Sequence, residues 1–104
     1  MDSQIEVIQK LCKARKIKWS VHATIRMQDR TISRADVIRC ILSGEIIEDY
    51  PTDYPFPSCL IFGYSVANKI LHVVVGHNDN EIYIITAYQP DNITFHDDLK
   101  TRRN

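Results

Sequence analysis

Glycine is scarce in this sequence: Gly44, Gly63 and Gly76 are the only three among 104 residues. Three isolated glycines cannot form the glycine-rich loop that cradles phosphates, so nucleotide hydrolysis by that route is excluded. No serine lies in a nucleophile-elbow pattern, and no cysteine has a histidine nearby in the sequence. Covalent catalysis therefore has no support in the sequence.

Long apolar runs are also missing, since the longest run of β-branched residues is Val73–Val75. A membrane-spanning helix needs about 20 mostly apolar residues. No apolar block of signal-peptide length follows Met1 either. We therefore expect no membrane partner and a cytoplasmic location.

Cysteine is sparse, and the spacing of the three residues Cys12, Cys40 and Cys59 predicts reduced thiols in a core rather than a disulfide framework. Zinc sites usually draw on closely spaced histidine or cysteine pairs. Such pairs are absent among His22, His72, His77 and His96. We expect no metal and no other cofactor, although a site assembled from distant residues stays open.

The formal net charge is zero, yet the charges are segregated along the chain. Residues 1–44 carry nine basic and four acidic side chains, residues 45–98 carry one and nine, and residues 99–104 carry three and none. The basic segment either lies beside an acidic sheet edge of the same molecule or forms a patch for phosphates. The charge alone does not choose between them.

Apolar residues at helical spacing, each set preceded by a capping serine, predict three helices in the first 44 residues. The expected helices are residues 4–15 with the Ser3/Glu6 capping pattern, residues 21–30 with Ser20, and residues 33–44 with Ser33/Asp36 and a stop at Gly44.

After Gly44 the apolar period becomes that of strands. Four strands are expected: EIIEDY (45–50), SCLIFGY (58–64), KILHVVVGH (69–77) and EIYIITAY (81–88). The prolines of PTDYPFP (51–57) predict a long loop, and the later links are short enough to force antiparallel neighbours. The alternation in IKWSV (17–21) indicates a further short strand.

These elements predict a single α+β domain in which N-terminal helices pack on one face of a four-stranded antiparallel sheet. Its expected parts are an N-terminal helix (1–18), a His/Arg helix and a third helix (19–44), the antiparallel sheet (45–90) and a polar C-terminal tail (91–104).

The stretch VHATIRMQDR places His22, Arg26 and Arg30 four residues apart, on one side of the expected second helix. Arginine keeps its charge and its planar guanidinium matches phosphate oxygens, whereas histidine exchanges a proton near neutral pH. These groups suit the handling of a phosphodiester. The alternative is a solvated helix face whose arginines pair with acidic neighbours.

His72 interrupts the apolar strand ILHVVV. A histidine there either satisfies a buried hydrogen bond or marks a cleft in the sheet face. Tyr88 shares a face with Thr86 on the last expected strand; the alternative for Tyr88 is an amphipathic aromatic at the domain rim. His77 and His96 fall in expected turns and are interpreted as surface residues.

Several motifs in the same order resemble a family of small bacterial proteins with a domain of unknown function. They are SVHATIRMQDRTISRADVIRCILSGEIIEDYP, SCLIFGY, LHVVVG and IYIITAYQPD, and the resemblance covers about residues 19–103. That family is similar to the RelE/ParE superfamily of toxins, and members of the family often look like partners of a small antitoxin that carries a zinc finger.

The resemblance implies a compact α+β toxin fold. RelE-like toxins are metal-independent ribonucleases that cleave messenger RNA, whereas ParE-like toxins poison gyrase through protein contacts, so the fold does not settle the activity. Two positions depart from the pattern: Thr31 stands where a glycine is expected, and Phe95 where a tryptophan is common.

The leading hypothesis is a metal-independent endoribonuclease toxin that uses the RNA 2′-hydroxyl as nucleophile, with RNA, on the ribosome or free, and an antitoxin as partners. The rival hypotheses are a non-catalytic protein-binding module, which the neutral net charge favours, and a housekeeping protein with a solvated His/Arg face. The candidate residues are His22 and His72 for proton transfer, Arg26 and Arg30 for transition-state charge, Tyr88 for orientation, and Arg102 and Arg103 for flanking phosphates.

Overall fold

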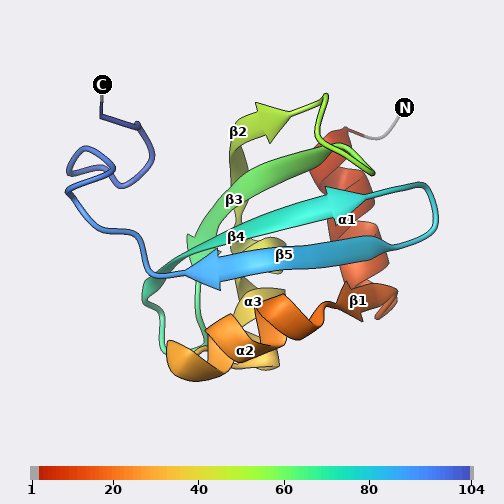
Figure 1. Ribbon diagram of the computed structural model, residues 1–104, viewed down its shortest axis with the longest axis horizontal. Helices are drawn as coiled ribbons and strands as arrows, with labels where there is room; N and C mark the ends of the chain where they lie inside the picture. Colours follow the sequence, from red (N-terminus) through yellow and green to blue (C-terminus); the bar gives the residue numbers. More distant parts are fainter. Residues whose placement is uncertain (1–2, 104) are drawn as a thin grey trace.

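The structure is a computed structural model that describes residues 3–103; residues 1, 2 and 104 of the predicted domain lie outside the described residues. Figure 1 shows helices stacked on a twisted sheet. The elements in chain order are α1 (Gln4–Lys13), β1 (Ile17–Trp19), α2 (Val21–Asp29), α3 (Arg34–Ser43), β2 (Glu45–Tyr50), β3 (Ser58–Tyr64), β4 (Ile70–His77) and β5 (Ile82–Tyr88).

All three helices begin at the predicted serine caps. The hydroxyls of Ser3, Ser20 and Ser33 each accept a hydrogen bond from the backbone N–H three residues later, at 3.4, 3.0 and 3.0 Å. At α3 the Asp36 carboxylate accepts a hydrogen bond from the Ser33 N–H at 3.0 Å, which completes the capping box. The capping pattern in the sequence is therefore confirmed as the local cause of the helix starts.

The sheet has five strands in the order β1-β5-β4-β3-β2, so the predicted four-stranded antiparallel sheet is wrong in strand number and in type. β2 to β5 form the expected antiparallel meander, but β1 adds a parallel edge strand by pairing Ile17 with Ile82 and Trp19 with Ile84. Alternation in the sequence indicated the strand at 17–21. It carried no information about a pairing partner so far along the chain.

The helices cover one face of the sheet, with α1 and α3 behind the strands in Figure 1. The core between these layers holds the three cysteines, which are buried free thiols as predicted. α3 packs so closely on β3 that a Cβ atom at Gly63 would lie 2.2 Å from the carbonyl oxygen of Cys40. Only glycine fits there. No helix within residues 3–103 is long and apolar enough to cross a membrane.

α2 ends in a Schellman motif in which Thr31 has a left-handed backbone, with φ of 57°. The Thr31 N–H donates to Gln28 at 3.2 Å and the Ile32 N–H donates to Met27 at 2.8 Å. This conformation favours glycine, the residue that the family resemblance led us to expect, and it is strained for a β-branched side chain. The turn nevertheless keeps its shape.

Replacing Thr31 with glycine should raise the free energy of unfolding by about 0.5–1 kcal/mol, because relief of the left-handed strain exceeds the added chain entropy of glycine. Urea denaturation of Thr31→Gly beside Thr31→Ala measures this, since alanine retains the strained Cβ atom. A lower stability of the glycine variant than of the alanine variant would contradict the account.

Candidate functional site

The C-terminal tail, residues 91–103, folds over the face of the sheet that the helices leave uncovered. In Figure 1 it leaves the end of β5 on the left. Phe95 is 1% exposed, and its ring centroid lies 4.7 Å from that of His72. The polar tail predicted from the sequence is therefore anchored by a buried aromatic side chain.

His72 is fully buried on β4, where it lies between Phe62 of β3 and Tyr88 of β5. Its Nε2 atom is 2.7 Å from the carbonyl oxygen of Leu99, so Nε2 carries the proton and donates it. In the neutral ring Nδ1 is then an acceptor, and it lies 3.3 Å from the Tyr88 hydroxyl. Burial lowers the pKa of His72 and outweighs the opposite effects of the Leu99 carbonyl and Glu48.

Tyr88 lies half-buried beside His72 and points its hydroxyl to the histidine ring. Burial raises the pKa of Tyr88, although the cations Arg102 and Arg30 act in the opposite direction. The hydroxyl therefore keeps its proton near neutral pH, as a hydrogen-bond donor to His72. Sequence analysis connected neither residue to the tail that encloses them.

Arg30 caps the C-terminal end of α2 and reaches across to β5. Its Nη1 atom donates to the Ala87 carbonyl at 2.8 Å and to the Thr86 hydroxyl at 3.3 Å. Thr86 thus serves as an anchor for the guanidinium, which accounts for a hydroxyl on this strand. Arg30 is exposed, so the remaining N–H groups of its guanidinium can face a ligand.

Arg30 and Tyr88 line one cleft of about 360 Å³ at the junction of α2, β5 and the tail. The other lining residues are Gln89, Asp91, Thr94 and Phe95. We call this the Arg30–Tyr88 cleft. Asp91 stays anionic there because backbone N–H groups of Thr94 and Ile93 lower its pKa. None of these four residues was predicted as a site residue from the sequence, and the QPDN turn after β5 was the one signal that could have placed Asp91.

His22 and Arg26 are exposed on α2 and do not line the cleft. At the helical rise, His22 lies about 12 Å from Arg30 along the helix axis. The stripe predicted from the sequence exists on α2, but only its last member reaches the cleft. His22 and Arg26 can meet a long ligand that follows the helix, not the same atoms as Tyr88.

The tail arginines Arg102 and Arg103 are engaged within the protein. Arg102 makes a bidentate pair with Glu48, with Nε and Nη2 each 3.1 Å from a carboxylate oxygen. Arg103 Nε donates to the carbonyls of Asn92 at 2.7 Å and Phe95 at 3.0 Å. Both side chains therefore hold the tail in place, and any phosphate would have to compete with these contacts.

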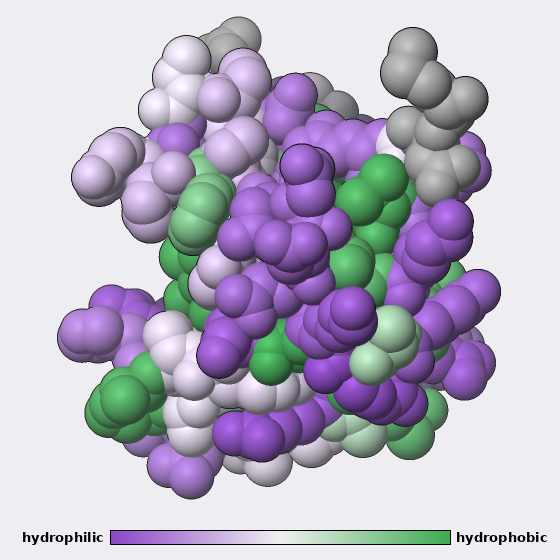
Figure 2. Space-filling view, turned by 90° about the vertical axis from the view of Figure 1, so that its right-hand side faces the viewer, coloured by the Kyte–Doolittle hydropathy of each residue, from purple (hydrophilic) through white to green (hydrophobic). Residues whose placement is uncertain are grey.

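The acidic side chains of residues 45–98 are partly neutralised by cations of the tail, through the pairs Lys100–Glu45, Arg102–Glu48 and Arg103–Asp97. On the helical side, Lys13, Lys16 and Lys18 are exposed, as are Arg34 and Arg39. Figure 2 shows hydrophilic side chains over much of the face that lies on the right of Figure 1. Of the two explanations for the segregated charge, this arrangement favours an exposed basic surface.

A second cavity, of about 180 Å³, lies toward the β4–β5 hairpin and is lined by aromatic side chains. Phe56 and Tyr83 stack there with centroids 4.9 Å apart, and Tyr54 is 91% exposed. We call this the aromatic groove. Asp53 lines it and Glu81 accepts a hydrogen bond from the Tyr83 hydroxyl, so its surroundings are acidic and unsuited to phosphate.

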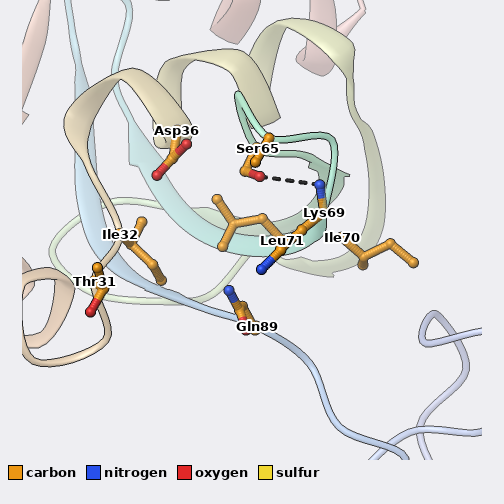
Figure 3. A pocket seen from close by; sticks show the side chains of 9 residues that line it. Thr31, Ile32, Asp36, Ser65, Lys69, Ile70, Leu71 and Gln89 are labelled. Atoms are coloured by element: carbon orange, nitrogen blue, oxygen red, sulfur yellow. Dashed lines mark hydrogen bonds between the residues drawn. The ribbon is translucent and has the colours of Figure 1, made fainter.

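A third cavity is smaller and polar, about 120 Å³, and lies where Thr31 and Ile32 meet the β3–β4 turn (Figure 3). Within residues 3–103 there is no group of three or more His, Cys, Asp or Glu side chains placed to hold a metal ion. The Arg30–Tyr88 cleft combines a fixed cation with a proton donor.

A family described as "Domain of unknown function (DUF4258)" matches residues 19–89, which include α2, α3 and strands β2 to β5. The match ends at Gln89, before the tail that encloses His72. No curated protein and no solved structure matches the chain.

Acidification should destabilise the protein through His72. Because the folded pKa of His72 lies below its ordinary value, folding favours the neutral ring, and this contribution is complete above about pH 6.5 and is lost as the pH falls through the folded pKa. Urea denaturation should show a stability loss between pH 6.5 and pH 5.5 of at most about 1.4 kcal/mol from this one group. His72→Gln should reduce that loss, and His96→Gln, at an exposed histidine, should not. An equal loss in all three proteins would contradict the assignment.

Proposed function

This chain belongs to the DUF4258 family, and we propose that it is a metal-independent endoribonuclease that acts as the toxin of a toxin–antitoxin pair. The observation that carries the proposed activity is the shared cleft of Arg30 and Tyr88. The toxin role, the RelE/ParE relationship and the zinc-finger antitoxin rest on the motif resemblance alone.

The Arg30–Tyr88 cleft supplies two groups that RNA cleavage needs. The Arg30 guanidinium is held at Thr86 and Ala87 and needs no rearrangement to face charge on a phosphate. Tyr88 carries a proton that its raised pKa keeps in place near neutral pH. A fixed cation beside a fixed proton donor suits a phosphodiester whose charge increases in the transition state.

In the proposed step the 2′-oxygen of RNA attacks the adjacent phosphorus, forming a 2′-O–P bond as the P–O5′ bond breaks. The 2′-hydroxyl proton passes to the Asp91 carboxylate, while the Tyr88 hydroxyl rotates away from His72 Nδ1 and gives its proton to the departing 5′-oxygen. The products are a 2′,3′-cyclic phosphate and a 5′-hydroxyl end. Water then carries the proton from Asp91 back to Tyr88, so the protein is unchanged.

His72 is a positioning residue in this scheme, because a fully buried ring reaches the substrate only through Tyr88. Its Nδ1 atom fixes the direction of the Tyr88 hydroxyl, and its Nε2 proton fixes the tail at Leu99. His22 and Arg26 take the role of contacts to flanking RNA along α2. The exposed basic surface of the helices also favours binding of the flanking RNA on this side of the molecule.

Tyr88→Phe and Arg30→Gln should each lower cleavage of a purified RNA by about 100-fold or more, because one removes the proton donor and the other removes the charge. The matched control is Tyr64→Phe, which removes the hydroxyl of an exposed tyrosine on β3. The assay follows 5′-hydroxyl ends by gel electrophoresis, with an oligonucleotide carrying 2′-deoxyribose at the cleavage site as a substrate that should stay intact.

Unchanged cleavage by both variants would contradict the site. Induced expression of the same variants separates chemistry from toxicity: wild type should arrest growth with fragmented RNA, and Tyr88→Phe should do neither. Arrest with intact RNA in both strains would instead support a protein target.

The second candidate function is a non-catalytic protein-binding module, and the aromatic groove is the observation that favours it. Its exposed Tyr54 and Ile85 lie beside Asp53, so a partner segment with basic and apolar side chains would fit. An antitoxin with such a segment is compatible with either function. Toxicity that depends on Tyr54 but not on Tyr88 would favour this candidate.

A further inference from the structure

The small polar cavity of Figure 3 adjoins the Arg30–Tyr88 cleft, because Gln89 lines both. Thr31, the neighbour of Arg30 in the chain, is also part of its wall. A strand of RNA with one phosphate at Arg30 would therefore place a neighbouring nucleotide at this cavity. We call it the Gln89 pocket.

The wall of the Gln89 pocket is apolar on one side and polar at the rim. Ile32 and Leu71 come from the buried core, while Asp36 and Lys69 contribute charges of opposite sign. In Figure 3 the polar ends of Lys69 and Gln89 lie on the same side of the view, below Asp36. The pocket thus offers a surface for a flat ring and hydrogen-bonding groups for its edge.

Asp36 is fixed rather than mobile. One carboxylate oxygen accepts the Val66 N–H at 3.0 Å and the other accepts the Ser33 N–H at 3.0 Å. The carboxylate therefore connects the start of α3 to the β3–β4 turn, and it keeps lone pairs for a further donor. Hydrogen bonds from Ser33 and Val66 also hold its pKa below the ordinary value despite the opposing effect of burial.

These groups select for a base rather than a phosphate. The Asp36 carboxylate accepts N–H groups, which the edge of a nucleobase offers and a phosphodiester does not. Lys69 and the Gln89 amide supply donors for the acceptors of the same edge. The volume, equal to about four water molecules in the liquid, fits a base without its sugar and phosphate.

We propose that the Gln89 pocket reads the base of the nucleotide next to the scissile phosphate, through Asp36, Lys69 and Gln89. This inference rests on the proposed ribonuclease function and adds a source of sequence specificity to it. The phosphate at Arg30 positions the RNA, and the pocket distinguishes the bases.

The test is cleavage of an RNA with a randomised segment by the purified full chain, followed by sequencing of the new ends. Wild type should prefer one base at a position next to the cut. Lys69→Ala and Gln89→Ala should each reduce that preference by about tenfold, the loss expected for one base contact. The controls Lys10→Ala and Gln28→Ala change exposed residues of the same types outside the pocket and should keep the preference.

The outcomes separate the two proposals. Cleavage without any base preference, or a preference that survives in Lys69→Ala and Gln89→Ala, would overturn the pocket assignment and leave the ribonuclease function standing. No cleavage by the wild type would overturn the ribonuclease function, and the pocket assignment with it.

Discussion

The hydrogen bond between the buried His72 ring and the Leu99 carbonyl is the contact on which the position of the C-terminal tail, over the sheet face opposite the helices, depends. Without it, the Nε2–H group of His72 would lie unpaired among aromatic side chains, which costs about 1–3 kcal/mol. The tail must therefore lie over the sheet for His72 to be buried at a tolerable free energy. Conversely, the isolated bridge between Phe95 and Arg102 pairs the tail with itself, and the described part of the tail, residues 91–103, is held on the sheet through contacts of side chains such as His72.

The position of the tail in turn defines the Arg30–Tyr88 cleft. Three of its lining residues, Asp91, Thr94 and Phe95, belong to the tail, whereas Arg30 and Tyr88 belong to the body of the domain. The bidentate pair of Arg102 with Glu48 also attaches the tail to β2. Hydrogen bonds from Arg102 and, to a smaller extent, from the Tyr50 hydroxyl lower the pKa of Glu48 in spite of burial, so the pair stays charged at neutral pH.

Local features were predictable from the sequence because their causes are local. Ser3, Ser20 and Ser33 marked helix starts, and the apolar period located each strand of the meander. The parallel pairing of β1 with β5 was not predictable, since alternation identifies a strand but not its neighbour. The site divides in the same way: helical spacing places Arg30 and His22 at opposite ends of α2, whereas the cleft depends on a tail that the sequence indicated only as polar. The identity of His72 as a buried positioning group likewise depends on Leu99, a contact between residues far apart in the chain.

Nitrogen-15 NMR of the His72 ring at pH 7 tests the central claim most directly, because its two nitrogen shifts report which nitrogen carries the proton. The account predicts a neutral ring protonated at Nε2, with Nδ1 as acceptor for the Tyr88 hydroxyl and a spectrum that changes when Tyr88 is replaced by phenylalanine. A ring protonated at Nδ1, or a doubly protonated ring at pH 7, would contradict the contact between the tail and the sheet from which the site is built.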